Sequence, residues 1–85
     1  MTDVVWAQAA RRDLLDIAEQ YREVDPALPY EILMRVEHAP KALLEFPGMG
    51  SPTTRQGIRK WPVRGTPFLL FYAFVGNRIE IRRGH

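Results

Sequence analysis

The chain has 85 residues, of which 46% are apolar and 26% are charged, and its formal net charge is +2. This length suits one compact domain, so we expect a single domain over residues 1–85. Cysteine is absent and histidine occurs twice. These counts exclude disulfides, iron–sulfur clusters and thiolate zinc sites, and we expect no metal and no cofactor. The longest apolar run, residues 68–75, is too short to cross a bilayer and residues 1–10 lack a signal-peptide pattern, so we expect a cytoplasmic protein without a membrane partner.

The charge is divided unevenly along the chain. Residues 1–50 hold five basic and nine acidic side chains, a net charge of −4, whereas residues 51–85 hold seven basic side chains and one acidic side chain, a net charge of +6. Six of those seven basic residues are arginine, which suits bidentate contacts to phosphate or carboxylate. The C-terminal half therefore predicts a surface for an anionic partner, although a solvated basic face is the alternative.

The N-terminal half predicts a short strand followed by two helices. Val4, Val5 and Trp6 are strand formers. Residues 7–21 then carry apolar side chains at helical spacing, with charged residues on the other face. Asp25 and Pro26 have the pattern of an N-cap and a first helical residue.

The second predicted helix extends to about residue 46 and contains two further prolines. Pro40 lacks the N–H that would bind the carbonyl four residues earlier, so it should kink or break the helix. Pro29 marks an alternative start of this helix. The expected buried row of the second helix is Leu33, Val36, Leu43 and Leu44.

The C-terminal half predicts three strands after a turn-rich segment at residues 47–52. The strands are expected at residues 57–63, 68–75 and 78–83, and Gly76-Asn77 is a two-residue hairpin turn. The order β-α-α-β-β-β predicts an α+β fold in which a helical hairpin packs on one face of a small antiparallel sheet. Residues 68–75 are apolar on both faces, so this strand should be central.

The two-residue turn also predicts the register of the last hairpin. The pairs expected on the helix-facing side are Phe74 with Ile79, Tyr72 with Ile81, and Leu70 with Arg83. The pairs expected on the other side are Val75 with Arg78, Ala73 with Glu80, and Phe71 with Arg82. A single bulge would reverse these assignments.

Short motifs spread over nearly the whole chain, in a characteristic order, resemble a known family. They are Val4-Val5-Trp6, Asp25-Pro26, Leu44-Glu45-Phe46-Pro47 with Gly48 and Gly50, Gly57-Ile58-Arg59, Gly65-Thr66-Pro67-Phe68, Phe71-Tyr72 and Ile79-Glu80-Ile81. The set resembles the ParE/RelE superfamily of toxins from type II toxin–antitoxin systems, and within it the plasmid- and chromosome-stabilising ParE toxins.

The resemblance implies a function as well as the RelE/ParE-like β-α-α-β-β-β fold. It implies a toxin that inhibits DNA gyrase and arrests growth, held in a hetero-oligomer by an acidic ParD-like antitoxin. RelE proteins share the fold but cut mRNA on the ribosome, so a ribosome-dependent mRNA endonuclease is one alternative. A non-toxic relative that only binds an antitoxin is another, because Ala73 stands where many relatives carry arginine and the segment after Arg83 is short.

A metal-independent ribonuclease would need a base, an acid and cations close together. The candidate catalytic residues are Arg59, Arg82, Arg83, Tyr72 and His85. Tyr72 is better placed for the core, Glu80 for an ion pair with a neighbouring arginine, and His85 is expected to be mobile at the chain end. We therefore expect a gyrase inhibitor rather than an enzyme, and an mRNA endoribonuclease if it is one.

The residues expected to bind a partner are Arg59, Lys60, Trp61, Arg82 and Arg83. Arg59 matches an arginine of the family's second strand, and its alternative role is a salt bridge to a helix carboxylate. Trp61 would anchor a partner if exposed, or else pack in the core. The groove expected to take an antitoxin helix is lined by Leu14, Ile17, Ala18, Leu33 and Val36. Most of these five residues must lie in the core, so only the residues at the edge of the groove would be accessible to the partner.

Overall fold

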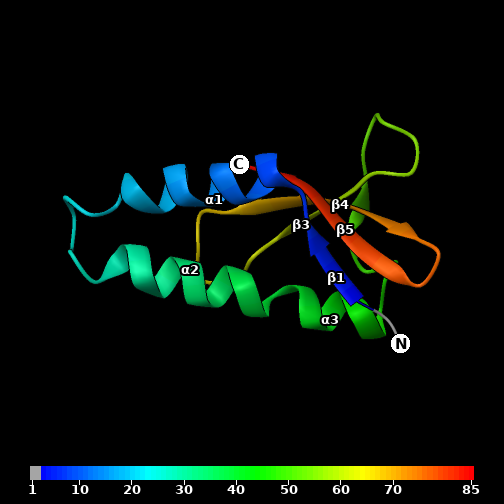
Figure 1. Cartoon of the computed structure of the whole chain (residues 1–85), viewed down its shortest axis with the longest axis horizontal. Helices are drawn as coiled ribbons and strands as arrows, with labels where there is room; N and C mark the ends of the chain where they lie inside the picture. Colours follow the sequence, from blue (N-terminus) through cyan, green and yellow to red (C-terminus); the bar gives the residue numbers. More distant parts are fainter. Residues whose placement is uncertain (1–2) are drawn as a thin grey trace.

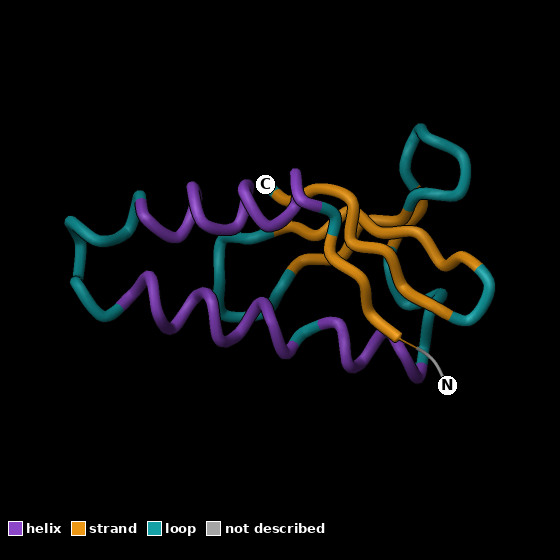
Figure 2. Tube along the Cα trace, in the orientation of Figure 1, coloured by secondary structure: helices purple, strands orange, loops and turns teal. Residues whose placement is uncertain are grey.

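The structure is a computed structural model that describes residues 3–85, with helices packed on one face of a five-stranded sheet (Figures 1 and 2). The elements in chain order are β1 (Asp3–Trp6), α1 (Gln8–Glu19), α2 (Leu28–His38), α3 (Pro40–Glu45), β2 (Ser51–Pro52), β3 (Arg59–Pro62), β4 (Leu69–Val75) and β5 (Arg78–Gly84). The expected α+β fold is confirmed. Within residues 3–85, no helix is both long enough and apolar enough to span a membrane.

The strands lie in the order β1-β5-β4-β3-β2, so β4 is central, as the sequence predicted. The sheet is mixed rather than wholly antiparallel, because β1 runs parallel to β5 while the other neighbours are antiparallel. The cause is the long helical segment after β1. It carries the chain from one edge of the sheet to the other and leaves β1 to be paired by the last strand.

Helix α1 buries one narrow face. Ala10, Leu14 and Ala18 recur every four residues and are all nearly inaccessible to solvent, so they form a row against the sheet and α2. Figure 1 shows α1 and α2 side by side, with their connection extending beyond the sheet. The predicted helix over residues 7–21 is confirmed, although it is slightly shorter at both ends.

The second helix differs from its prediction at its start. The Asp25 carboxylate accepts a hydrogen bond of 2.9 Å from the backbone N–H of Ala27, which forms a tight turn instead of a helix cap. The helix begins at Leu28 with Pro29 in its first turn, so the alternative start is correct. The expected break at Pro40 is confirmed, because α2 ends at His38 and α3 begins at Pro40.

The buried row of this helix was predicted only in part. Val36 and Leu43 are fully buried, whereas Leu33 and Leu44 are partly buried at the edge of the core. Ile32, which was not predicted in the buried row, is 5% exposed and lies in the core. The kink at Pro40 shifts the helical phase between the two segments, so one continuous periodicity cannot describe both.

The segment between α3 and β3 contains a strand that the sequence did not predict. Ser51 and Pro52 pair with Lys60 and Arg59 at the edge of the sheet, where a proline is tolerated. The Thr53 hydroxyl donates to the carbonyl of Ile58 at 2.9 Å and closes the connecting loop. Because of this loop, β3 begins at residue 59, whereas the predicted strand began at residue 57.

The β4–β5 hairpin confirms four of the six predicted pairs. From the Gly76-Asn77 turn these run from Val75–Arg78 to Tyr72–Ile81. A bulge between Phe71 and Tyr72 then pairs Phe71 with Arg83 and Leu70 with Gly84. The predicted Leu70–Arg83 and Phe71–Arg82 pairs are therefore wrong.

Packing against Phe68 accounts for the shifted end of this hairpin. A Cβ atom at Gly84 would collide with the Phe68 ring, which is itself only 1% exposed. Glycine is the one residue that can lie against this ring, and the bulge brings Gly84 to it. The helix-facing side of the sheet then closes over a core in which Leu70, Tyr72, Ile79 and Ile81 are each 0% exposed.

Candidate functional site

Arg59 holds the loop that precedes β2. Its Nη1 donates to the carbonyl of Gly50 at 2.7 Å and to that of Gly48 at 3.4 Å. The alternative salt bridge to a helix carboxylate is absent from the ion pairs of residues 3–85. Arg59 therefore has a structural contact, although with backbone carbonyls rather than with an acidic side chain.

Tyr72 fixes the same loop from the core. Its hydroxyl donates to the carbonyl of Pro47 at 2.7 Å and accepts a hydrogen bond from the N–H of Gly50 at 2.9 Å. The residue is fully buried, so the predicted core position is confirmed. A Cβ atom at Gly50 would lie 2.6 Å from the tyrosine oxygen, which shows how closely the loop backbone approaches the ring.

A pocket of about 510 Å³ lies beside this clamped loop. Arg55 and Arg59 line it together with the exposed ring of Phe74. The other lining residues are Pro47, Gly48, Pro52, Thr53, Gln56, Gly57 and Ile58. Arg59 is therefore at a surface, but its Nη1 hydrogen bonds are directed to the loop.

Three charged side chains of β5 form a surface network. Glu80 accepts contacts from Arg78 at 2.7 Å and from Arg82 at 2.9 Å. The hydrogen bonds from Arg78 and then Arg82 hold the pKa of Glu80 below its ordinary value. The predicted ion pairing of Glu80 is confirmed, and its carboxylate is therefore not free to act as a base at neutral pH.

Arg83 connects the end of β5 to helix α1. Its Nε and Nη2 donate to the two carboxylate oxygens of Asp13 at 2.8 Å and 3.1 Å. The N–H of Gly84 also donates to Asp13, at 3.0 Å. Burial by itself would raise the pKa of Asp13, but the hydrogen bonds from Arg83 and Gly84 outweigh it and lower the pKa. No motif or spacing indicates this role, since Asp13 is one of several acidic residues on α1.

His85 is ordered by the sheet. Its carbonyl accepts from the N–H of Leu69 at 2.7 Å, and its own N–H donates back to the Leu69 carbonyl at 3.0 Å. The imidazole packs edge-on against Phe71, with ring centroids 5.4 Å apart. The last residue is therefore paired with β4, and the bulge in β5 sets Leu69 as its partner.

Lys60 and Trp61 point to opposite faces of the sheet, because successive strand residues alternate. Lys60 is exposed and takes part in none of the ion pairs formed by residues 3–85. Trp61 packs on the core with one part of its surface and lines a second pocket, of about 860 Å³, with another. Its two alternative roles, core packing and an accessible aromatic surface, thus coexist.

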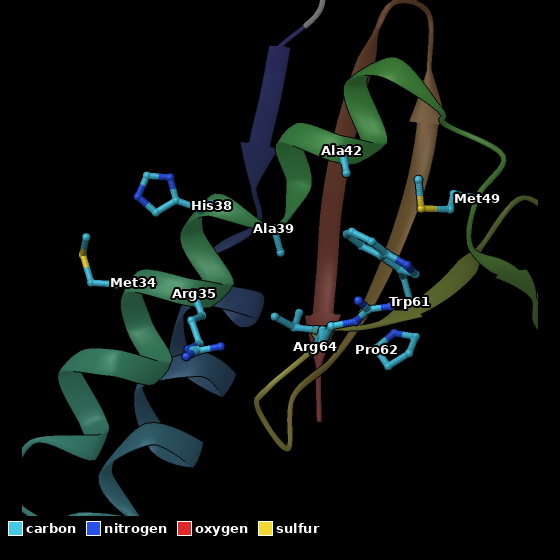
Figure 3. Close-up of a pocket in the computed structure, with 10 residues that line it drawn as sticks. Met34, Arg35, His38, Ala39, Ala42, Met49, Trp61, Pro62 and Arg64 are labelled. Atoms are coloured by element: carbon cyan, nitrogen blue, oxygen red, sulfur yellow. The ribbon is translucent and has the colours of Figure 1, made fainter.

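The larger pocket lies between α2–α3 and β3 (Figure 3). It is lined by Met34, Arg35, His38, Ala39, Ala42, Met49, Trp61, Pro62, Val63 and Arg64. Of this set, only Trp61 was predicted from the sequence to bind a partner. The missed residues come from three separated segments, and no local spacing connects them.

The five residues of the expected antitoxin groove lie mostly inside the molecule. Leu14, Ala18 and Val36 are at most 3% exposed, so they offer no surface to a partner. Ile17 and Leu33 are partly buried and form the accessible fringe. The accessible apolar surface between α1 and α2 is therefore small. The pocket of about 860 Å³ lies on the other side of α2.

Comparison with known proteins gives the family. The sequence model described as ParE toxin of type II toxin-antitoxin system, parDE, matches residues 4–83. The chain belongs to this family. Among solved structures, a chain described as "Chromosomal ParDE TA system from P. aeruginosa" matches this ParE-family chain with a TM-score of 0.84 and 24% identity. The match covers 98% of this chain and 92% of that chain, which supports the fold. A search of curated protein sequences gave no significant match.

Proposed function

We propose that this ParE-family chain is a toxin that inhibits DNA gyrase and is neutralised by a ParD-like antitoxin. The observation that carries the proposal is the match of the ParE toxin family over residues 4–83. The resemblance of the sequence to ParE rather than RelE favours gyrase over the ribosome as the target. On this proposal the toxin acts by binding, and it does not itself cleave a substrate.

The contacts of Tyr72 and Glu80 support a binding mode of action. Tyr72 is buried and its hydroxyl is occupied by Pro47 and Gly50, while Glu80 is occupied by two arginines. Acid–base cleavage of RNA requires a proton donor and a proton acceptor beside the scissile phosphate. Tyr72 and Glu80 are both engaged in structural contacts, so the mRNA endonuclease is the weaker alternative.

The outward face of the sheet provides a surface for the target. Lys60, Arg78 and Arg82 lie on exposed positions of β3 and β5, and these three cations outnumber the one acid, the partly buried Glu80. A cationic surface accelerates association with an acidic partner and weakens as salt screens it. We assign contact with gyrase to this face.

Purified protein tests the proposal directly. It should reduce supercoiling by gyrase in a plasmid assay and increase the amount of linear, cleaved DNA. Adding the antitoxin encoded beside the toxin gene should restore supercoiling. Translation of a reporter mRNA in a cell-free system serves as the control reaction and should continue at its normal rate.

Two results would contradict the proposal in different ways. Arrest of translation with cleaved, ribosome-bound mRNA and normal supercoiling would establish the RelE-like alternative. Normal growth after induced expression without an antitoxin, together with unaffected supercoiling, would establish the non-toxic relative.

A further inference from the structure

The smaller pocket, of about 510 Å³, lies where three segments meet at one end of the sheet. The turn after α3 contributes Pro47 and Gly48, the segment from Pro52 to Arg59 contributes most of the lining, and β4 contributes Phe74. Figure 1 shows the loop after β2 at the end of the molecule opposite the α1–α2 connection. The two pockets share no lining residue, so this one is a separate feature of the fold.

Two arginines give the smaller pocket a positive charge. Arg55 and Arg59 line it, none of its ten lining residues is acidic, and neither arginine belongs to an ion pair within residues 3–85. Two loop carbonyls hold Nη1 of Arg59, which fixes the position of the guanidinium. Its Nε and Nη2 donate to no acceptor in the described part of the chain. The same two nitrogens of Arg83 bind both oxygens of Asp13, so this edge of Arg59 suits one anionic group.

An exposed aromatic ring lies beside the fixed arginine. Arg59 pairs with Tyr72, and Phe74 is two residues further along β4 on the same face of the sheet. Diagonal neighbours of this kind are about 7–8 Å apart, which is within reach of a long side chain. Phe74 is 48% exposed, although it is apolar. A ring face that is exposed next to a cation is a platform on which a flat heterocycle stacks.

Part of the pocket wall is bare backbone. Gly48 and Gly57 line the pocket, and nothing lies within 4 Å of a Cβ atom built at either residue. The Thr53 hydroxyl closes the loop that carries Gly57, because it accepts from the N–H of Arg55 at 3.2 Å and donates to the carbonyl of Ile58 at 2.9 Å. Gly57 has a φ angle of +80°. Glycine therefore both permits this turn and lets a ligand approach its backbone.

We propose that the smaller pocket binds a nucleoside phosphate. The phosphate binds Arg55 and the unoccupied edge of Arg59, and the base stacks on Phe74. The exposed amide of Gln56, which can donate and accept hydrogen bonds, contacts the edge of the base. A simple carboxylate or phosphate would engage only the arginines, whereas a nucleotide also uses the ring and the amide.

The ligand is either a free nucleotide or one nucleotide of a single strand. The net charge of +6 in residues 51–85 attracts both, and it attracts a strand more strongly because a strand carries one phosphate per nucleotide. The inference goes beyond the proposed function, since it does not depend on gyrase as the target. It concerns binding alone and involves no covalent step.

The first test uses the unmodified protein and three small ligands. AMP carries a base and a phosphate, whereas adenosine and inorganic phosphate each carry one of the two. NMR follows the backbone amides of Gly48 and Gly57 during each titration. AMP should shift both signals in a saturable manner, and adenosine and phosphate should each bind at least about tenfold more weakly. Inorganic phosphate that binds as tightly as AMP, or AMP that leaves both amides unchanged, would overturn the proposal.

The second test separates the two sources of the ligand and compares them with a peptide. Binding of an eight-nucleotide oligo(dA) that is more than about tenfold tighter than that of AMP would support the proposal with a single strand as the ligand. Similar or weaker binding of oligo(dA), with AMP bound at the pocket, would support it with a free nucleotide. An oligoglutamate peptide that binds more tightly than both would overturn the proposal and assign the pocket to a protein partner.

The third test uses two matched pairs of variants. Phe74→Leu removes the stacking ring, whereas Phe46→Leu makes the same change at a residue that is 61% exposed and does not line the pocket. Arg55→Gln removes a pocket cation, whereas Arg12→Gln removes an exposed cation of α1. Phe74→Leu and Arg55→Gln should each weaken AMP binding by about tenfold, and the two controls by no more than about twofold. Equal losses within either pair would overturn the proposed site.

Discussion

The loop before β2 is positioned by a few specific atoms. Tyr72 binds it through one donated and one accepted hydrogen bond, and Arg59 binds its carbonyls. The loop in turn borders both pockets, because Met49 lines one while Pro47 and Gly48 line the other. Substitutions here should therefore change stability and the shape of both pockets together.

Gly50→Ala should destabilise the protein, whereas Gly48→Ala should not. At Gly50 an added Cβ would lie 2.6 Å from the Tyr72 oxygen and 2.8 Å from the backbone oxygen of Lys60, while at Gly48 nothing lies within 4 Å. We expect Gly50→Ala to lower the free energy of unfolding by about 1–3 kcal/mol. Urea denaturation followed by circular dichroism measures both variants, and equal stability would show that the loop moves aside without cost.

Tyr72→Phe should also destabilise the fold, by about 1–3 kcal/mol, because it leaves the Gly50 N–H and the Pro47 carbonyl without their partner. Tyr30→Phe is the matched control, since Tyr30 is 67% exposed. Thermal and urea unfolding of the two variants give the comparison. A Tyr72→Phe protein as stable as the control would mean that water replaces the hydroxyl at both atoms.

At the scale of elements, one carboxylate of α1 joins the end of the C-terminal strand to the first helix. Asp13 binds the Arg83 side chain and the Gly84 N–H, and Gly84 lies against Phe68. These contacts join β5 to the first helix over a sequence separation of about seventy residues. The bulge pairs Arg83 with Phe71, and the same end of β5 is held against α1 by Asp13.

The Asp13 contact predicts a loss of stability in acid. Arg83 and Gly84 lower the folded-state pKa of Asp13 below its ordinary value of 3.8, so ionised Asp13 stabilises the folded state above that pH. The contribution should disappear as the pH falls from about 4 through the lowered pKa. Asp13→Asn should reduce stability at pH 7 by about 1–2 kcal/mol and weaken the pH dependence below pH 4. Denaturation from pH 7 to pH 2 measures the effect, and parallel curves for the two proteins would contradict it.

At the scale of the whole molecule, β3 separates two surfaces. Lys60 faces outward from the sheet, while Trp61 lines the pocket on the helix side. A toxin that binds its target on the outward face of the sheet and its antitoxin on the helix side should allow the two kinds of binding to be separated by mutation. Surface charges far apart contribute independently to association.

Lys60→Glu should therefore weaken gyrase inhibition by about fivefold to tenfold and leave antitoxin binding unchanged. Lys41→Glu makes the same charge change on an exposed position of α3 and should alter gyrase inhibition by less than about twofold. Supercoiling assays over a range of toxin concentrations, with antitoxin affinity measured by calorimetry, test the pair. Loss of both activities in Lys60→Glu would place target and antitoxin on one surface.

The sequence by itself determined the local elements and the family. The helical period of α1, the break at Pro40 and the Gly76-Asn77 turn follow from short-range backbone preferences, which act within a few residues. Only the tertiary structure decided that β1 pairs in parallel with β5, that the hairpin is bulged at Phe71, and that Asp13 meets Arg83. It also decided that Arg35, Arg64 and Trp61 share one pocket. Each of these features joins segments that are distant in the sequence. Whether such segments meet depends on how the whole core packs, and the spacing of residues within one segment does not predict it.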